Sequence, residues 1–481
     1  MKKTDFILLF FVVVLAVAMR LYQINTPLAD FHSWRQADTA AVARNFVRSG
    51  FDLMHPKYDD LTSIQSGIDN PQGYRFVEFP IYNAIFAGLY NLSPTIPIEV
   101  YGRLTTIFFS LIVIVCLYYL ALKELGRVAA ISSSFIYAVF PFFVFFSRVV
   151  LPETTALGFT FISITLLYMF VNAKKEPLRW ILFFFSALSF AAALLVKPTV
   201  IFYGIVLLYL FLSRYKLDTI KRLDMYLFFA LSIVPLFLWR NYILSFPEGI
   251  PASDWLITSV NTSEGLKSIF FRPAFFRWIF FERINNIILG GFVTFFLVLG
   301  LVAKNKSRFL MFLTGSALTY VFVFQGGNVQ HEYYQTLILP VLAMAAGGGV
   351  ELLLSKKFQS ITNRLTSIVV VFVVLVISFL FSYNHVKGYY GYPEDLSQIA
   401  RLIQTFTKPD DLIITDTTGD TTLLYLADRR GAPAQYKELP EMKNIGYSYL
   451  ISFEKEKTTK LKEEGIYPII FENDKLAIFH L

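Results

Sequence analysis

Long apolar runs recur along the whole chain, and short basic connections separate most of them. Runs of about 17–25 residues have the length that a helix needs to cross the hydrocarbon core of a bilayer. The strands of a transmembrane barrel would instead alternate polar and apolar residues in short segments, which excludes that class. The pattern therefore predicts a polytopic membrane protein whose membrane part is all-α.

The basic connections predict how the chain is oriented in the membrane. They all fall on one side, which the positive-inside rule makes the cytoplasm, when the spans lie at about 100–122, 127–147, 153–173, 180–196, 199–213, 224–244, 285–303, 308–324, 336–354 and 366–384. With a first span near the N-terminus this gives about eleven transmembrane helices, with the N-terminus cytoplasmic and the C-terminus outside. Ala16-Val17-Ala18 is similar to a signal-peptidase site, but apolar residues continue to Tyr22, so we expect an uncleaved first span.

Two long external loops interrupt this pattern. Residues 25–99 form the first, with helices expected near 33–49 and 80–92. The apolar segment 80–92 is too short to span, so we expect it to lie in the outer interface. The second loop, 245–284, is rich in Trp, Phe and Arg, which is typical of an interfacial belt.

The character of the chain changes after the last apolar run. Residues 388–481 mix polar, charged and apolar positions and predict a small extracytoplasmic α/β domain, following a transmembrane domain at 1–387. Within the small domain we expect helices at 396–406, 421–427 and 455–464, strands at 412–415 and 449–452, and a hairpin at 467–479.

Composition narrows the class further. The chain is 55% hydrophobic and only 16% charged, which fits a membrane protein. Its formal charge of +8 reflects Lys and Arg in cytoplasmic loops, so we expect no nucleic-acid partner. The single cysteine, Cys116, excludes a disulfide within the chain.

The first polar constellation lies in the first external loop. Asp30, His32, Arg35 and Asp38 follow directly on the first apolar run, and the last three are spaced one helical turn apart. A carboxylate held by neighbouring donors can serve as a general base. The alternative is an ordinary amphipathic helix wetted on one face.

Two more constellations lie at the outer ends of predicted spans. Arg148 and Glu153 form one, and a carboxylate at the mouth of a membrane helix is costly unless it is paired or functional. Lys197 departs from the positive-inside pattern and could bind an anionic lipid headgroup. The alternatives are a structural ion pair for Glu153, with Arg148 as partner, and snorkelling for Lys197.

The remaining polar residues are also on the predicted outer face. Glu78 precedes the short apolar segment, and His331, Tyr333 and Tyr334 lie in a glycine-containing loop. His331 next to Glu332 is too little for a metal site, since adjacent ligands alone do not make one. Carboxylates and cations that meet at the outer leaflet suit transfer of a group from an anionic lipid carrier.

These motifs resemble the GT-C superfamily of polytopic glycosyltransferases, and most closely the bacterial branch related to protein O-mannosyltransferases and lipid A aminoarabinose transferases. The resemblance rests on the long first loop with its acidic helix, Glu78-Phe79-Pro80, Arg103, Glu153, Lys197 and the stretch from His331 to Pro340. Phe79 stands where the aminoarabinose relatives carry Lys, and Arg75 or Arg103 could replace that contact.

The resemblance implies an inverting glycosyltransferase of a bacterial cytoplasmic membrane, with a polyprenyl-phosphate sugar as donor and a lipid, polysaccharide or protein as acceptor. Asp38 is expected as the base, with Asp30 as second candidate, and Glu153 shapes the acceptor site or shares the base role. Lys197 and Arg148 are expected to stabilise the leaving phosphate. The other expected substrate-binding residues are Glu78, Arg35, His32, Arg103, His331, Tyr333 and Tyr334.

No cofactor is expected to be required, and a divalent metal is compatible with the site but not indicated. Two other classes stay open. A transporter or flippase of lipid-linked sugars would also have many spans and buried charges, although no internal repeat is visible. A non-catalytic partner of a glycosyltransferase is the third class.

Overall fold

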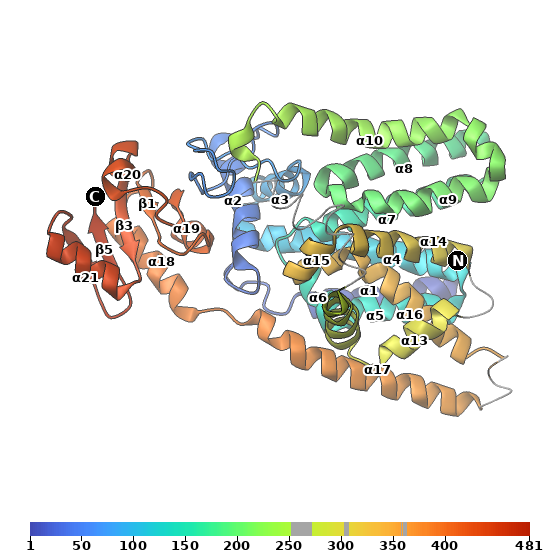
Figure 1. Cartoon of the computed structure of the whole chain (residues 1–481). Helices are drawn as coiled ribbons and strands as arrows, with labels where there is room; N and C mark the ends of the chain where they lie inside the picture. The colour runs from blue at the N-terminus through green and yellow to red at the C-terminus, as the bar shows by residue number, and fades with distance from the viewer. Residues whose placement is uncertain (252–271, 303–306, 357, 359–362) are drawn as a thin grey trace. The chain divides into compact units, whose positions relative to one another are not determined.

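The computed structural model describes residues 1–251, 272–302, 307–356, 358 and 363–481, and most of them are helical (Figure 1). The chain divides into two compact units, which are described separately. The helical unit comprises Met1–Ile24, Arg103–Arg240 and the described part of Asp254–Tyr389. The mixed unit comprises Asn25–Gly102, the described part of Asn241–Ser253, and Tyr390–Leu481.

The helical unit contains helical structure at each predicted span, so the polytopic helical fold is confirmed. Its elements are α1 (Lys3–Arg20), α4 (Ile98–Glu124, which begins in the mixed unit), α5 (Arg127–Val139), α6 (Pro141–Phe146), α7 (Glu153–Asn172), α8 (Glu176–Val196), η1 (Pro198–Tyr203), α9 (Gly204–Tyr215), η2 (Lys216–Lys221), α10 (Leu223–Ile243), α12 (Pro273–Phe276), η5 (Arg277–Ile288), α13 (Val293–Val302), α14 (Arg308–Val323), α15 (Gln325–Gln330), η6 (Glu332–Ile338), α16 (Leu339–Leu353), α17 (Arg364–Val386) and η8 (Lys387–Tyr390). By length and composition, seven helices of the described chain could cross a membrane, or eight if one bent pair counts as a span.

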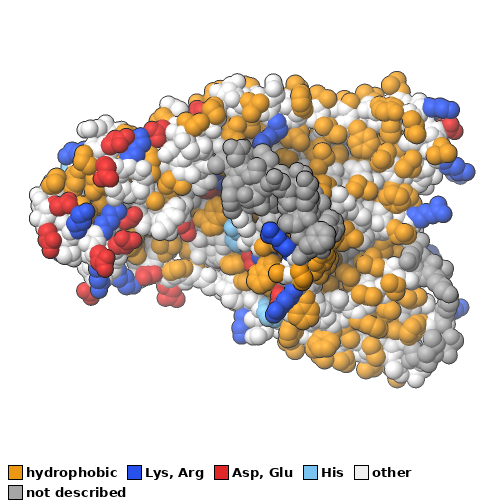
Figure 2. All heavy atoms as spheres, in the orientation of Figure 1, with side chains coloured by type: hydrophobic (Ala, Val, Ile, Leu, Met, Phe, Trp, Pro, Cys, Tyr) orange, Lys and Arg blue, Asp and Glu red, His pale blue; other side chains and the backbone are white. Residues whose placement is uncertain are grey.

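Exposed apolar side chains cover these helices. Figure 2 shows hydrophobic side chains gathered over the helical elements, while charged side chains gather over the C-terminal residues. On α8 the exposed side chains include Trp180, Phe184 and Phe185, and on α17 they include Phe372 and Leu380. An apolar surface of this extent would be unfavourable in water and is suited to lipid.

Two predicted spans are interrupted rather than continuous. Segment 127–147 breaks between α5 and α6 because Pro141 has no N–H to offer the carbonyl of Tyr137. The buried Arg20 side chain donates to the carbonyls of Tyr137 (2.9 Å) and Ala138 (2.8 Å) and so replaces helical bonds at this break. Segment 285–303 belongs to the bent pair, in which Pro273–Ile288 and Val293–Val302 meet at 118°.

A glycine makes the second break possible. Gly290 has a φ of 61°, and a Cβ atom at this position would collide with the carbonyl oxygen of Ser378. The predicted loop 245–284 is helical from Pro273 onward, where it forms α12 and then the π-helix η5. Residues 252–271 of that loop lie outside the described residues.

The mixed unit begins with the two helices expected in the first loop, α2 (Ser33–Ser49) and α3 (Ile81–Leu92). After η3 (Pro247–Gly249), its C-terminal part contains α18 (Glu394–Phe406), β1 (Leu412–Ile414), α19 (Thr422–Ala427), β2 (Gly431–Ala432), α20 (Leu439–Ile445), β3 (Tyr447–Ser452), α21 (Lys455–Glu464), β4 (Ile469–Glu472) and β5 (Ala477–His480). The five strands form one sheet in the order β2-β1-β3-β5-β4.

The sheet is parallel on one side and antiparallel on the other. β1 is parallel to β2 and β3, and β5 is antiparallel to β3 and β4. Alternate residues point to opposite faces, so Ile414 and Leu450 pack with α20 and α21, whereas Ile413 and Ile451 pack with α18 and α19. The predicted α/β character is confirmed, and β2 and α20 are additions to it.

The first loop extends this sheet. Asp60 forms a parallel bridge with Gly431, flanked by hydrogen bonds from Gly431 N to Asp59 O (2.9 Å) and from Leu61 N to Gly431 O (2.8 Å). Residues 25–102 and 390–481 therefore form one folded body rather than a loop and a separate cap. The division at residue 387, the membrane placement of α3 and the orientation of the chain stay predictions.

Candidate active site

The start of α2 is held in an unusual backbone conformation. His32, which precedes the helix, has φ 60° and ψ 37°, a left-handed conformation that is uncommon outside glycine. This turn brings Asp30 back over the first helical turn, where its Oδ1 accepts a hydrogen bond from Gln36 Nε2 (2.6 Å). Asp30 is buried, and the ring of His32 packs on Phe31 at 4.1 Å. Strain of this kind is often found at functional sites.

Arg35 joins α2 to the segment before α3. Its Nη2 lies 2.6 Å from Glu78 Oε1, and both side chains are largely buried. Asn83 of α3 donates to the carbonyl of Thr39 at 2.6 Å, which holds the two helices together. The structure therefore brings together two residues that the sequence predicted separately, Arg35 and Glu78.

Asp38 lies one turn further along α2 and is enclosed by its own unit. Its Oδ2 lies 2.7 Å from Arg75 Nη2, and its Oδ1 accepts a hydrogen bond from the Thr421 hydroxyl at 2.6 Å. Burial raises the pKa of Asp38, against the opposing effects of Arg75 and Thr421. Arg75, expected as a substitute phosphate contact, is engaged here with a carboxylate.

A second charged cluster follows on the same helix, and sequence reasoning missed it. Arg44 pairs with Asp59 (2.5 Å) and Asp428 (2.8 Å), and its guanidinium lies 4.1 Å from the ring centroid of Tyr425. The Tyr425 hydroxyl donates to Glu99 at 2.9 Å. The consecutive carboxylates Asp59 and Asp60 in a short loop were the available signal, but their partners are remote in sequence.

The helical unit contains the other part of the predicted site. Glu153 is the first residue of α7, and Lys197 directly follows α8. Their side chains are buried and lie 2.6 Å apart, from Nζ to Oε1. Glu153 Oε2 is buried and has no hydrogen-bond partner among the described residues. The Lys197 ammonium also lies 5.3 Å from the ring centroid of Tyr334.

Arg103 and Arg148 hold the chain that follows α1. Arg103 Nη1 donates to the carbonyl of Ile24 at 2.7 Å. Arg148 donates to the carbonyls of Tyr22 and Gln23 at 3.3 Å each. Both guanidinium groups are fully buried. Glu153 forms an ion pair with Lys197, and the pairing with Arg148 suggested by the sequence stays a prediction.

The aromatic loop is ordered around a buried arginine. His331 stacks on Tyr333 with centroids 5.3 Å apart, and Tyr333 contacts Tyr334 at 4.4 Å. Arg283, which the sequence analysis placed only in an interfacial belt, lies 3.2 Å from Glu332. In the described part of the chain, no three His, Cys, Asp or Glu side chains are grouped as a metal site would require.

Comparison with known proteins gives a match to one family model over part of the chain, and a fold. Residues 80–239 match the model of the family described as dolichyl-phosphate-mannose-protein mannosyltransferase. Among solved structures, ArnT from Cupriavidus metallidurans, bound to undecaprenyl phosphate, is similar with a TM-score of 0.68 at 14% identity, covering 100% of this chain and 98% of that one. The chain has a GT-C fold.

A second solved structure supports the same fold. The oligosaccharyltransferase of Archaeoglobus fulgidus, in a complex with Zn and sulfate, is similar with a TM-score of 0.60 at 11% identity, covering 92% of this chain and 67% of that one. No curated protein matches the sequence in a direct comparison. The predicted resemblance is confirmed, and with it the prediction of a helical membrane protein with a small C-terminal sheet.

In this GT-C fold the predicted residues form two groups, one within each unit. The mixed unit contains Asp30, His32, Arg35, Asp38 and Glu78. The helical unit contains Arg103, Arg148, Glu153, Lys197, His331, Tyr333 and Tyr334. Their roles in catalysis or substrate binding stay predictions.

Proposed function

We propose that this GT-C protein is a glycosyltransferase that moves a sugar from a polyprenyl-phosphate donor to an acceptor at the outer face of a bacterial cytoplasmic membrane, with inversion at the anomeric carbon. The observation that carries the proposal is the buried Glu153–Lys197 pair with its unpartnered carboxylate oxygen. Both residues lie within the stretch 80–239 that matches the mannosyltransferase family. The similar ArnT structure contains undecaprenyl phosphate, a donor carrier of the proposed class.

Lys197 is the proposed contact for the donor phosphate. Its ammonium group lies 2.6 Å from Glu153 Oε1 in a buried ion pair. A fixed cation beside the donor phosphate stabilises the charge that develops as the phosphate leaves. Glu153 holds the ammonium in place and, at the first position of α7, is itself stabilised by the helix dipole.

The proposed base is a carboxylate of the segment that begins α2. It takes the proton of the acceptor hydroxyl or amine as that atom attacks the anomeric carbon, and the sugar–phosphate bond breaks with its electrons leaving on the polyprenyl phosphate. Asp38 has the raised pKa that suits a base, but both of its oxygens are engaged by Arg75 and Thr421. Asp30 lies at the strained turn before the helix, so we place it first and Asp38 second, reversing the order predicted from the sequence.

The test is transfer of a labelled sugar by the purified protein in liposomes that contain the polyprenyl-phosphate donor. Asp30→Asn is expected to abolish transfer without lowering the melting temperature, whereas Asp38→Asn lowers the melting temperature and retains some transfer. Lys197→Ala is expected to weaken donor binding, and Lys174→Ala, at an exposed lysine, serves as its control.

Two results would contradict the proposal. Movement of the labelled lipid across the bilayer without transfer would indicate a flippase. Full transfer by both Asp30→Asn and Asp38→Asn would remove the base from this segment.

A further inference from the structure

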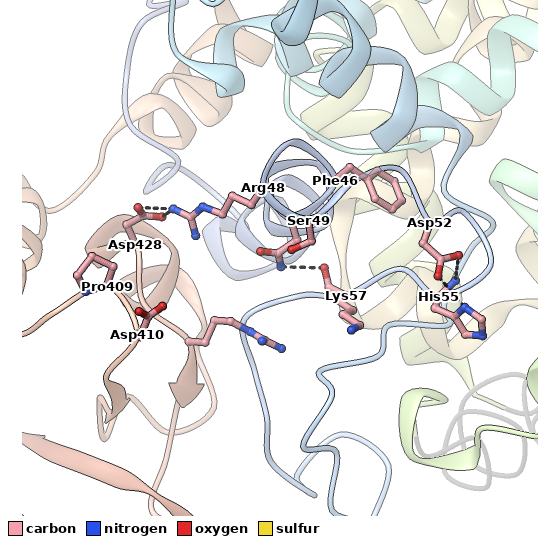
Figure 3. A pocket seen from close by; sticks show the side chains of 12 residues that line it. Phe46, Arg48, Ser49, Asp52, His55, Lys57, Pro409, Asp410 and Asp428 are labelled. Atoms are coloured by element: carbon pink, nitrogen blue, oxygen red, sulfur yellow. Dashed lines mark hydrogen bonds and ion pairs between the residues drawn. The ribbon is translucent and has the colours of Figure 1, made fainter.

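A cavity lies in the mixed unit at the C-terminal end of α2 (Figure 3). Its volume is about 660 Å³, within the range of about 300–1,000 Å³ that is usual for ligand pockets. It lies where the end of α2 and residues 50–57 of the first loop meet segments 409–410 and 428–430 of the C-terminal sheet domain. None of its lining residues belongs to the Glu153–Lys197 group or to the segment proposed to carry the base.

Of the three carboxylates at this cavity, Asp428 has a cationic partner, and Asp52 and Asp410 are exposed. Arg48 binds Asp428, and His55 Nδ1 lies 2.8 Å from Asp52 Oδ2, as Figure 3 shows. Asp410 is the remaining acidic residue, and it is exposed. Solvent screens the charges of the exposed Asp52 and Asp410 more than those of the partly buried Lys57 and Arg430, so the cavity favours an anion.

Two cations at the cavity have no ion-pair partner in the described chain. The Lys57 ammonium makes only a cation–π contact, 5.7 Å from the ring centroid of Tyr74. Arg430 donates from Nη2 to the carbonyl of Gln72 at 2.8 Å, and its Nε is buried with no hydrogen-bond partner. An unpaired buried donor is costly unless a ligand or water satisfies it.

The walls of the cavity are preorganised. The His55 ring is fixed between Asp52 and the Tyr242 hydroxyl, which lies 2.9 Å from Nε2, and it packs against Phe246 at 5.2 Å. The Asn45 amide donates to the carbonyl of Lys57 at 3.0 Å. Planar rings beside fixed polar groups can contact both the apolar faces and the hydroxyl groups of a sugar.

We propose that this cavity binds the acceptor and that the acceptor is an anionic saccharide, whose phosphate or carboxylate group is bound by Lys57 and Arg430. The acceptor role rests on the proposed glycosyltransferase function, whereas the anion site rests on the cavity itself. Helical rise places Phe46 about 20 Å along α2 from Ser33, the start of the helix that follows Asp30, at about 1.5 Å per residue. An acceptor that fills the cavity and reaches the base is therefore longer than one sugar.

Titration calorimetry on the full chain in nanodiscs, without donor, tests the anion site. The probes are glucose 6-phosphate, glucuronate, glucose and inorganic phosphate. We expect the two anionic sugars to bind more tightly than glucose and inorganic phosphate. Equal affinity for glucose would overturn the anionic class, and equal affinity for inorganic phosphate would overturn the saccharide.

Variants locate the site. Lys57→Ala is expected to weaken binding of both anionic sugars at least tenfold, and Lys57→Arg to retain it. Lys460→Ala, at an exposed lysine of α21, is the matched control and should bind as the unaltered protein does. Arg430→Lys is a second variant, which keeps the positive charge. Its melting temperature shows whether the fold is intact. Unchanged binding by Lys57→Ala would overturn the site.

The two proposals can fail separately. Transfer assays with an anionic acceptor should show a raised KM and an unchanged kcat for Lys57→Ala. An unchanged KM in an active enzyme would overturn the acceptor role while leaving the glycosyltransferase function intact. Binding of the anionic sugars by a protein that transfers no sugar would overturn the function and leave the anion site.

Discussion

Two buried ion pairs, one in each unit, have nearly the same length and different surroundings. Glu153 and Lys197 lie 2.6 Å apart with side chains 2% and 7% exposed, and Asp38 and Arg75 lie 2.7 Å apart with side chains 1% and 7% exposed. Asp38 has a further donor in Thr421, so both of its oxygens are engaged. Glu153 has an oxygen without a hydrogen-bond partner in the described chain.

This difference bears on which of the two pairs can bind a ligand. Burying two charges costs free energy that their attraction offsets only when the remaining hydrogen-bonding capacity is also satisfied. In the Asp38 pair each carboxylate oxygen has a partner, Arg75 for Oδ2 and Thr421 for Oδ1, and the pair joins α2 to the start of α19. Glu153 Oε2 has no hydrogen-bond partner in the described chain, so a hydrogen bond from a hydroxyl group of a bound sugar would be favourable there.

The largest expected effect is that of breaking the Glu153–Lys197 pair. Lys197→Met leaves Glu153 buried without its cation, and removing one partner of a buried pair costs about 3–5 kcal/mol. We expect a lower melting temperature in detergent and loss of donor binding. The double variant Glu153→Gln/Lys197→Met removes both charges and should recover most of the stability but not the binding. If the single variant melts as the unaltered protein does, the pair is not buried as described.

The pH dependence of stability tests another buried carboxyl of the mixed unit, that of Asp60. Burial raises the pKa of Asp60 from 3.8 to about 6, despite its hydrogen bonds from Thr62. Between these two values the folded protein binds more protons than the unfolded chain, so stability falls as pH rises from about 4 to about 6 and then levels off. A shift of about 2 units corresponds to about 2–3 kcal/mol.

The matched variant isolates this carboxyl from all others that titrate. Asp60→Asn keeps an acceptor oxygen for Thr62 but does not ionise. The difference in unfolding free energy between the two proteins, measured by urea unfolding from pH 4 to pH 7, should change by about that amount in favour of the variant. A difference that does not vary with pH would show that Asp60 titrates normally.

The extent to which the sequence predicts this structure depends on how local each interaction is. The helices Ser33–Ser49 and Lys455–Glu464 were predicted with their observed bounds, because their ends are marked by local turn and charge patterns. The strand Gly431–Ala432 was not predicted, since two residues carry no periodicity and the strand is held by hydrogen bonds with residues 59–61, which are remote in sequence. The Pro141 break was readable from the sequence, whereas the 118° bend depends on packing against Ser378.

The same distinction applies to the candidate site. Glu153 and Lys197 were each predicted, and their pairing follows from topology, because the start of one helix and the end of the next meet in a helical hairpin. The partners of Asp38 could not be predicted in this way, since Thr421 is 383 residues away. Contacts of that range depend on the fold of the whole mixed unit, and the role of Asp38 as base stays a prediction.

A smaller effect is expected when the Asp38–Arg75 pair loses its cation. Arg75→Met leaves Asp38 with Thr421, and Asp38 can take up a proton because its pKa is already raised by burial. We expect a loss of about 2 kcal/mol at pH 7, below the cost at Lys197 because protonation relieves the unpaired charge. The loss should shrink at pH 5, where the carboxyl is more easily protonated. Arg401→Met, at an exposed arginine of α18, is the control, and a loss independent of pH would argue against this explanation.

The smallest predicted effect concerns the Thr421 hydroxyl, which donates to the second oxygen of Asp38. Thr421→Val keeps the shape of the side chain and removes the hydroxyl that donates to Asp38 at 2.6 Å, which should cost about 1–2 kcal/mol. Thr421→Ser should restore most of it, and Thr459→Val on the exposed face of α21 should be nearly neutral. Because the hydroxyl also limits access to Asp38, transfer activity decides between the two carboxylates. If Thr421→Val lowers stability and leaves transfer unchanged, Asp38 is structural; if it raises transfer, Asp38 is the base and Thr421 had restrained it.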